Sequence, residues 1–207
     1  MKVTMKISYA GMVLAAMLIF TSGALSIPFI YESTTLWYKM GFDKTMLRTG
    51  QVAGMLALAL LLIQIVLAAR GRFLIEIFGL AGIIRWHRIN GLCIGLAAVV
   101  HVTLVLAPEG FANLPIGVKH WPEMVGGGLL ATLVLMVISS YFRERLHLGY
   151  KIWFLIHRVL GYLVPVILSV HVLFVSDSFH QFVPRTALVM TICIAGGLVV
   201  LSKKTGS

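Results

Sequence analysis

Long apolar stretches separated by short polar or charged segments dominate the sequence. Each stretch is close to the roughly 20 residues that an α-helix needs to cross the hydrocarbon core of a bilayer. Six of them are predicted as spans, at residues 9–30, 49–69, 89–107, 124–141, 158–175 and 184–201. The pattern predicts an all-α membrane protein, a bundle of six transmembrane helices that forms a single domain over residues 1–207.

The first stretch has a second interpretation. The sequence "MKVTMKISYAGMVLAAMLIFTSGALS" has the basic start, apolar middle and small-residue end of a signal peptide. Its apolar part, however, is longer than the roughly 7–15 residues of a signal-peptide core. We therefore predict a retained helix, with cleavage as the alternative.

Composition supports the membrane assignment. The 207 residues are 59% hydrophobic and 12% charged, whereas soluble domains are roughly 45–50% apolar and about 25% charged. A soluble core of this size cannot hide so many apolar side chains. The two cysteines, Cys93 and Cys193, lie far apart inside apolar stretches without metal-ligand spacing, so we expect them to fill space in the core.

The net charge of +10 does not point to nucleic acid, because the basic residues form short clusters between the apolar stretches. With six spans, one side of the membrane collects Lys2, Lys6, Arg70, Arg72, Arg85, Arg88, Arg143, Arg145, Lys151, Arg158, Lys203 and Lys204. The other side collects Lys39, Lys44, Arg48, Lys119 and Arg185. The positive-inside rule then places both termini in the cytoplasm of a multi-pass protein of the cytoplasmic (inner) cell membrane. The lipid bilayer is the first expected partner.

Two of the apolar stretches carry the same histidine motif. The segments "HRINGLCIGLAAVVH" (87–101) and "HRVLGYLVPVILSVH" (157–171) both read His-Arg-x-x-Gly, nine further residues, then His. Fourteen residues bring an α-helix round to within about 40° of its starting direction and advance it by about 21 Å. The two histidines of each segment therefore share one helix face near opposite leaflets.

The third and fifth spans both run outward from the cytoplasm, so their histidines are predicted to form two stacked pairs. His87 would lie opposite His157 near the inner leaflet, and His101 opposite His171 near the outer leaflet. Two facing imidazoles suit a haem, with the iron ligated from both sides and no open position, as in electron transfer. We predict two haems b between the third and fifth helices, with these four histidines as iron ligands.

Neighbouring residues fit the same prediction. Gly91 and Gly161 follow the inner histidines by four residues, on the same helix face, where a missing side chain would admit a flat macrocycle. Arg88 and Arg158 would lie near the inner haem propionates, since guanidinium groups pair well with carboxylates.

Simpler interpretations exist for each feature taken alone. A membrane histidine is often a hydrogen-bonded core residue, Gly91-x-x-x-Gly95 is a common helix-packing motif, and the two arginines could anchor helices at the interface. These readings explain poorly why the whole pattern occurs twice, and ionisable residues at membrane depth are costly enough to indicate function. His120, His147 and His180 fall in loops and are expected to be solvated.

The stretches "RWHRINGLCIGLAAVVH" and "YKIWFLIHRVLGYLVPVILSVH" resemble the ferric reductase and NADPH oxidase superfamily. The resemblance implies a six-helix membrane domain that holds two b-type haems through paired histidines on its third and fifth helices. His87, His101, His157 and His171 would then be the ligands. Electrons would pass from cytoplasmic NAD(P)H through FAD and the haems to an acceptor outside.

The sequence departs from that pattern after its last span, where only "SKKTGS" follows. We expect FAD or FMN only on a partner protein, and an electron-transfer subunit of an oxidoreductase that takes electrons from a separate flavoprotein, redox protein or quinol. An alternative relative is the haem-binding membrane subunit of the periplasmic methionine sulfoxide reductase system, in which no counterpart of His87 is expected. An alternative of another class, a small transporter or proton pathway, would need more polar groups between the histidines.

Overall fold

The computed structural model describes residues 3–110 and 113–205, and every regular element in these ranges is a helix. Six helices are long and apolar enough to cross a membrane, which confirms the predicted fold class. They are α1 (Val3–Ile30), α2 (Gly41–Ala69), α4 (Leu80–Leu106), α5 (Trp121–Tyr141), α6 (Tyr150–Val175) and α7 (Phe182–Thr205). Lys2, one of the basic residues of the predicted cytoplasmic side, lies outside the described residues.

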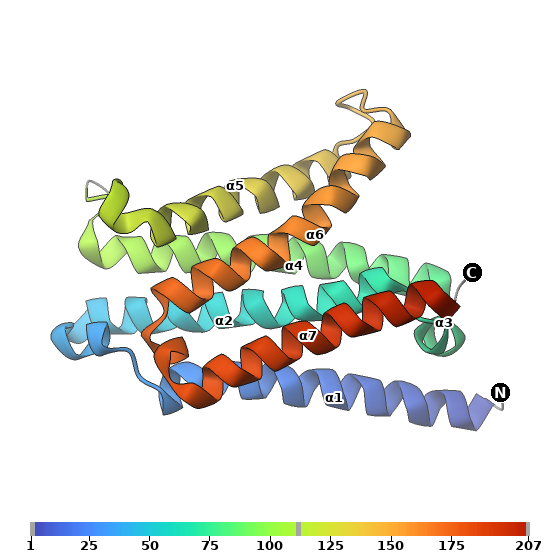
Figure 1. The fold of residues 1–207 in the computed structure, drawn as a ribbon, viewed down its shortest axis with the longest axis horizontal. Coiled ribbons are helices and arrows are strands. Elements are labelled where there is room, and N and C mark those ends of the chain that lie inside the picture. The colour runs from blue at the N-terminus through green and yellow to red at the C-terminus, as the bar shows by residue number, and fades with distance from the viewer. Residues whose placement is uncertain (1–2, 111–112, 206–207) are drawn as a thin grey trace.

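The six helices run alongside one another, and both ends of the chain lie at one end of the bundle (Figure 1). That end also holds the short helix α3 (Arg72–Phe78) and the α5–α6 loop; following the predicted orientation, we call it the inner end. The opposite, outer end holds four short 3₁₀-helices, namely η1 (Thr34–Tyr38), η2 (Ala107–Glu109), η3 (Val118–His120) and η4 (Asp177–His180).

The long helices extend further than the apolar stretches. The predicted spans began at residues 89 and 158, whereas α4 begins at Leu80 and α6 at Tyr150. Arginine, histidine and tryptophan near the inner ends interrupt the apolar pattern, but a helix can continue past the hydrocarbon core, where such side chains reach the headgroups. The inner histidines therefore lie within α4 and α6 rather than just before them.

Helix α3 was not predicted. It is bounded by Gly71 and Gly79, and the φ of Gly79 is +73°. This left-handed conformation favours glycine, and it lets the chain turn from α3 directly into α4.

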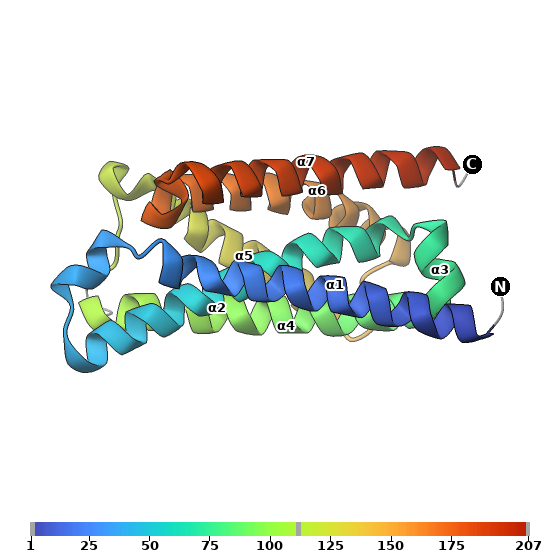
Figure 2. The ribbon, with the colours of Figure 1, turned by 90° about the horizontal axis from the view of Figure 1, so that it is seen from below.

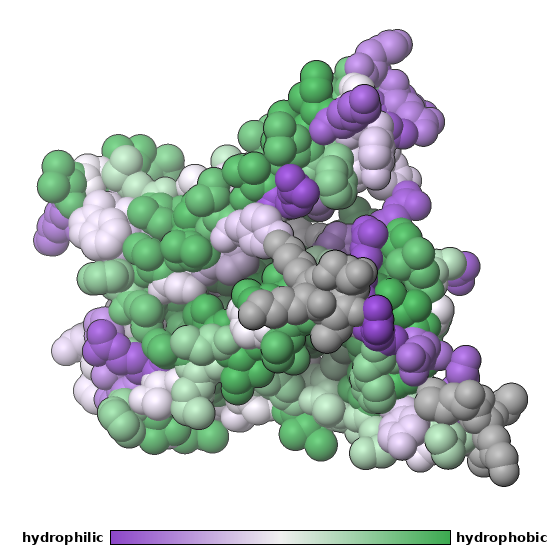
Figure 3. Space-filling model, turned by 45° about the vertical axis from the view of Figure 1, so that its right-hand side comes forward, coloured by the Kyte–Doolittle hydropathy of each residue, from purple (hydrophilic) through white to green (hydrophobic). Residues whose placement is uncertain are grey.

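Helix α2 lies at the centre of the bundle, packed against α1, α4 and α7 (Figures 1 and 2). One core cluster joins Met55, Leu58 and Leu62 of α2 to Phe179 and Leu188. The other helices expose most of their apolar side chains. These cover the length of the bundle in Figure 3, while hydrophilic side chains gather towards its ends, as expected of a surface that meets lipid.

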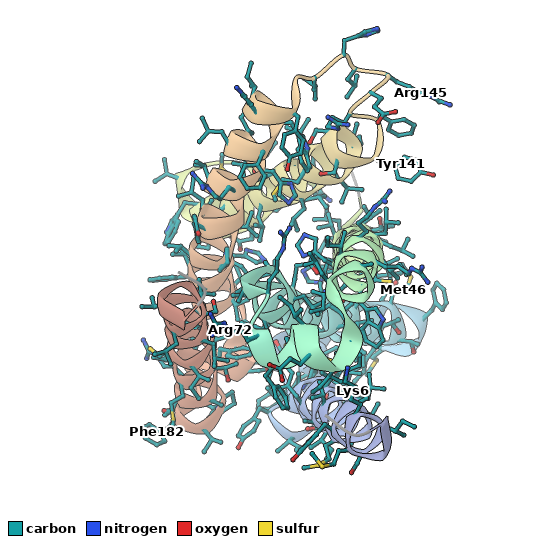
Figure 4. All side chains as sticks on the ribbon, turned by 90° about the vertical axis from the view of Figure 1, so that its right-hand side faces the viewer. Lys6, Met46, Arg72, Tyr141, Arg145 and Phe182 are labelled. Carbon is teal, nitrogen blue, oxygen red and sulfur yellow. The ribbon has the colours of Figure 1, made fainter. Side chains whose placement is uncertain are left out.

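The four central helices form two antiparallel pairs, α2 with α4 and α5 with α6, which meet through contacts between α4 and α5. A second core cluster, Leu61, Ile94, Leu129 and Val164, takes one residue from each of the four helices. At the inner end the α5–α6 pair diverges from the rest of the bundle (Figure 1). Figure 4, seen from that end, shows Tyr141 and Arg145 at the diverging tip, well away from Arg72 and Lys6.

Candidate functional site between the two helix pairs

The structure brings histidines of α4 and α6 together in the way that the spacing predicted. The ring centroids of His87 and His157 are 6.2 Å apart, and their planes are inclined by 66°. Towards the outer end, His101 and His171 are close enough to interact electrostatically. All four side chains are half-buried. One imidazole of each set comes from the α2–α4 pair and the other from the α5–α6 pair.

The outer histidines are each anchored to the backbone of the neighbouring helix. The Nδ1 atom of His101 lies 2.8 Å from the carbonyl oxygen of Gly50 in α2, and that of His171 lies 2.9 Å from the carbonyl oxygen of Pro122 in α5. Because a carbonyl oxygen only accepts, each Nδ1 carries the hydrogen and each Nε2 keeps its lone pair. A histidine that binds a metal through Nε2 is held in this way.

The inner histidines lack such anchors. The Nδ1 atom of His87 is buried without a hydrogen-bond partner. That of His157 lies 3.4 Å from the Ser140 hydroxyl, which donates its own hydrogen to the Met136 carbonyl at 2.6 Å. The His157 ring instead packs against Trp153, with centroids 5.3 Å apart. A cavity of about 50 Å³ borders the His157 and Trp153 rings and is large enough only for small molecules such as water.

Two amide side chains fix the backbone beside His87. Gln64 of α2 donates from Nε2 to the His87 carbonyl at 2.9 Å. Asn90 donates from Nδ2 to the Gln64 Oε1 at 2.7 Å and to the Leu60 carbonyl at 2.9 Å. Sequence reasoning missed this network, because neither amide belongs to a recognisable motif. It holds α2 against α4 and satisfies polar groups that would be costly to leave unpaired in a membrane.

The predicted glycine and arginine residues lie near the inner histidines in different settings. A Cβ atom at Gly161 would meet nothing within 4 Å, whereas one at Gly91 would lie 3.4 Å from Gln64 Nε2. Gly91 thus also permits the close approach of α2. Arg88 is exposed, and the Arg158 guanidinium lies 5.5 Å from the Phe154 ring centroid. Their predicted roles towards a haem remain predictions.

The remaining histidines lie at the ends of the bundle. His120 Nδ1 is 3.7 Å from a carboxylate oxygen of Glu123, His147 occupies the α5–α6 loop with φ +52°, and His180 ends η4. Within residues 3–110 and 113–205, no group of three or more histidine, cysteine, aspartate or glutamate residues is arranged to hold a metal ion. A metal held by two histidines would need its other ligands from a cofactor such as a porphyrin.

A polar contact at the outer end links loops that are far apart in the sequence. Asp177 accepts hydrogen bonds from the Ser33 hydroxyl at 2.9 Å, the Thr34 hydroxyl at 2.7 Å and the Thr34 backbone N–H at 3.1 Å. Burial raises the pKa of Asp177, but these three bonds outweigh it and hold the pKa below its usual value. No local pattern reveals a contact between residues so distant in the chain.

The separation of the inner rings suits two imidazoles that ligate one metal from opposite sides. A metal–imidazole nitrogen bond is about 2 Å long and the ring centroid lies about 1.1 Å further on, so rings on opposite sides of one metal have centroids roughly 6.2 Å apart. The His87–His157 separation is 6.2 Å. The outer pair fits by chemistry, since both Nε2 atoms are free to act as ligands.

The family model described as "Ferric reductase like transmembrane component" matches residues 53–176. The chain belongs to this family. The matched range contains most of α2, all of α4, α5 and α6, and the four histidines. This ferric reductase-like protein is therefore a membrane electron-transfer component. Comparisons with curated proteins and with solved structures find no match.

Proposed function

We propose that this ferric reductase-like protein is a b-type cytochrome that relays electrons across the cytoplasmic membrane through two haems. The observation that carries the proposal is the facing of His87 with His157 at a separation suited to a shared iron. A second pair of histidines lies further along the same two helices. A single structural histidine would explain neither the facing rings nor the repetition.

In this proposal each haem iron is held by one histidine of α4 and one of α6. His87 and His157 hold the inner haem, and His101 and His171 hold the outer one. A bound haem supplies one-electron chemistry at a six-coordinate iron, with no open position for a substrate. Arg88 and Arg158 supply positive charge near the inner propionates.

Electrons pass outward in this proposal, with both termini in the cytoplasm. Support comes from the excess of basic residues at the inner end, which follows the positive-inside rule. A negative interior favours outward movement of one electron by about 2.3 kcal/mol per 100 mV for a full crossing. The two pairs are separated by about 21 Å of helix rise. A porphyrin extends several ångströms from its iron, so the edges of the two haems would lie closer together than the two irons.

The electron donor is a separate flavoprotein, redox protein or quinol at the inner end, and the acceptor lies on the outer side. These 207 residues contain no G-x-G-x-x-G dinucleotide-binding motif, so we do not assign FAD or FMN to them. The position of His87 against His157 favours this relay over the methionine sulfoxide reductase-like alternative. Asn90 and Gln64 bond to each other and to backbone, which disfavours a proton pathway along the same helix.

The test is to purify the protein in detergent, record oxidised and dithionite-reduced spectra, and quantify haem per chain. We expect low-spin b-type bands at about two haems per chain. His101→Ala and His157→Ala should each reduce this to about one, while His147→Ala in the α5–α6 loop should leave it unchanged. One haem in the wild-type protein would favour the methionine sulfoxide reductase-like alternative. Absence of haem, from cells supplied with it, would refute electron transfer.

A further inference from the structure

Each outer histidine lies on a glycine of the neighbouring helix, four residues after the residue whose carbonyl it bonds. His101 bonds to Gly50 and lies against Gly54; His171 bonds to Pro122 and lies against Gly126. The bonded residue and its histidine are 51 positions apart in one helix pair and 49 in the other. The two helix pairs thus repeat one arrangement.

Neither glycine position has room for a side chain. A Cβ atom at Gly54 would lie 2.7 Å from Nδ1 and 2.9 Å from Cε1 of His101. At Gly126 it would lie 2.7 Å from Nδ1 and 3.0 Å from Nε2 of His171. Real Cβ atoms essentially never approach other heavy atoms closer than 3.0 Å, so an alanine at either position would displace the imidazole ring.

Helix geometry explains why the glycine follows the bonded carbonyl by four residues. In an α-helix the carbonyl of residue i accepts from the N–H of residue i+4, and its second lone pair stays available. The Cα–Cβ bond of residue i+4 leans towards the helix N-terminus, over that same carbonyl. In both helix pairs the imidazole reaches this second lone pair beside a residue i+4 that has no Cβ.

We propose that Gly54 and Gly126 are positioning residues for the outer haem. They form two matched seats, which we define as Gly50 with Gly54 and Pro122 with Gly126. Each seat fixes one imidazole with Nδ1 bonded and Nε2 available to iron. The positioning role rests on the proposed haem function, whereas the contacts that form the two seats are present without haem.

Other glycines of the same helices differ from these two. A Cβ at Gly50 would meet Val105 and Leu104 of α4 at 3.0–3.2 Å, tighter than nine in ten real Cβ contacts, so Gly50 permits the close approach of two helices rather than of an imidazole. A Cβ at Gly127 or Gly128 would meet nothing within 4 Å. Only Gly54 and Gly126, among the glycines of the described residues, have an imidazole as the neighbour of that missing side chain. Gly127 and Gly128 are therefore matched controls.

The experiment compares Gly54→Ala and Gly126→Ala with Gly127→Ala and Gly128→Ala in the full chain. Haem per chain is quantified, and low-temperature electron paramagnetic resonance resolves the two low-spin ferric signals. We expect each seat variant to weaken outer haem binding about 10–100-fold, the usual effect of losing a ligand's supporting contact, and to leave the inner signal unchanged. The controls should retain both signals. Unchanged signals in both seat variants would overturn the proposal.

A second measurement separates this inference from the proposed function. In haem-free protein labelled with ¹⁵N-histidine, the imidazole nitrogen shifts report which ring nitrogen carries the hydrogen. We expect His101 and His171 to carry it on Nδ1 in the wild-type protein, and to lose this preference when the corresponding seat is changed. A hydrogen on Nε2 in the wild type would overturn the seats, even if a variant fails to fold. Wild-type protein unable to bind haem would instead refute the proposed function.

Discussion

The outer and inner histidines occupy equivalent positions on α4 and α6 but are supported in different ways. His101 and His171 donate hydrogen bonds to backbone carbonyls and lie on glycines. His87 has an unpaired Nδ1, and His157 packs on Trp153. The outer rings are therefore fixed directly by a rigid backbone, whereas the inner rings are fixed mainly by their own helices and by aromatic packing.

This difference has a consequence for the chemistry of the two sites. Donation from Nδ1 makes an imidazole a more basic ligand at Nε2, which stabilises the ferric state of a bound haem. The outer ligands have this support and the inner ligands do not. His87 and His157 lie in the inner halves of α4 and α6, and the α5–α6 pair diverges from the bundle at that end (Figure 1).

Removal of either complete pair should have the largest effect. If the haems act in series, His87→Ala with His157→Ala and His101→Ala with His171→Ala should each reduce electron transfer across proteoliposomes by about 100-fold or more. Reduction of an external acceptor by an internal donor measures the rate. His120→Ala with His180→Ala, at the outer end, is the control. A rate that survives loss of one pair would contradict a relay in series.

The two haems should also differ in reduction potential. We expect two components in a potentiometric titration, with the lower potential at the outer haem, since its ligands are the more basic. A tenfold difference in relative affinity for the ferric state corresponds to about 59 mV. The variant His87→Ala with His157→Ala retains only the outer haem and assigns the components. If the haem that remains in this variant has the higher of the two reduction potentials, the Nδ1 hydrogen bonds of the outer histidines do not control the difference between the haems.

The spacing of the histidines, together with the outward direction of both spans, predicted that His87 lies beside His157, because helix periodicity is a local property. The six spans were predicted from the length of the apolar stretches, which is also a local property of the sequence. The seats were not predicted, because Gly50-x-x-x-Gly54 has the form of an ordinary packing motif and nothing in the sequence shows which side chain lies against it. The Asp177 contact with Ser33 and Thr34 depends on how loops meet in three dimensions.

The amide network at the inner end offers a smaller effect confined to that end. Asn90→Leu removes hydrogen bonds to Gln64 and Leu60, and interhelical hydrogen bonds in membranes contribute about 0.6 kcal/mol on average and up to about 1.7. We expect a destabilisation of this size in reversible unfolding, with a change in the inner haem signal only.

A double-mutant cycle with Gln64→Leu should show that the two residues are coupled. Thr103→Val, at an exposed position of α4, is the control. A change in the outer haem signal would show that the network acts on the whole bundle.

The smallest expected effect concerns pH at the outer end, away from both histidine pairs. Hydrogen bonds from Ser33 and Thr34 hold the pKa of Asp177 below its usual 3.8 despite burial. The carboxylate therefore stabilises the folded protein above that pH, and this contribution is lost as the pH falls through the lower, folded-state value of the pKa.

Asp177 remains partly exposed, so we expect Asp177→Asn to lower the thermal midpoint by less than about 2 °C at pH 7. The difference from wild type should shrink towards pH 3. A constant difference between pH 7 and pH 3 would mean that Asp177 acts through shape rather than charge.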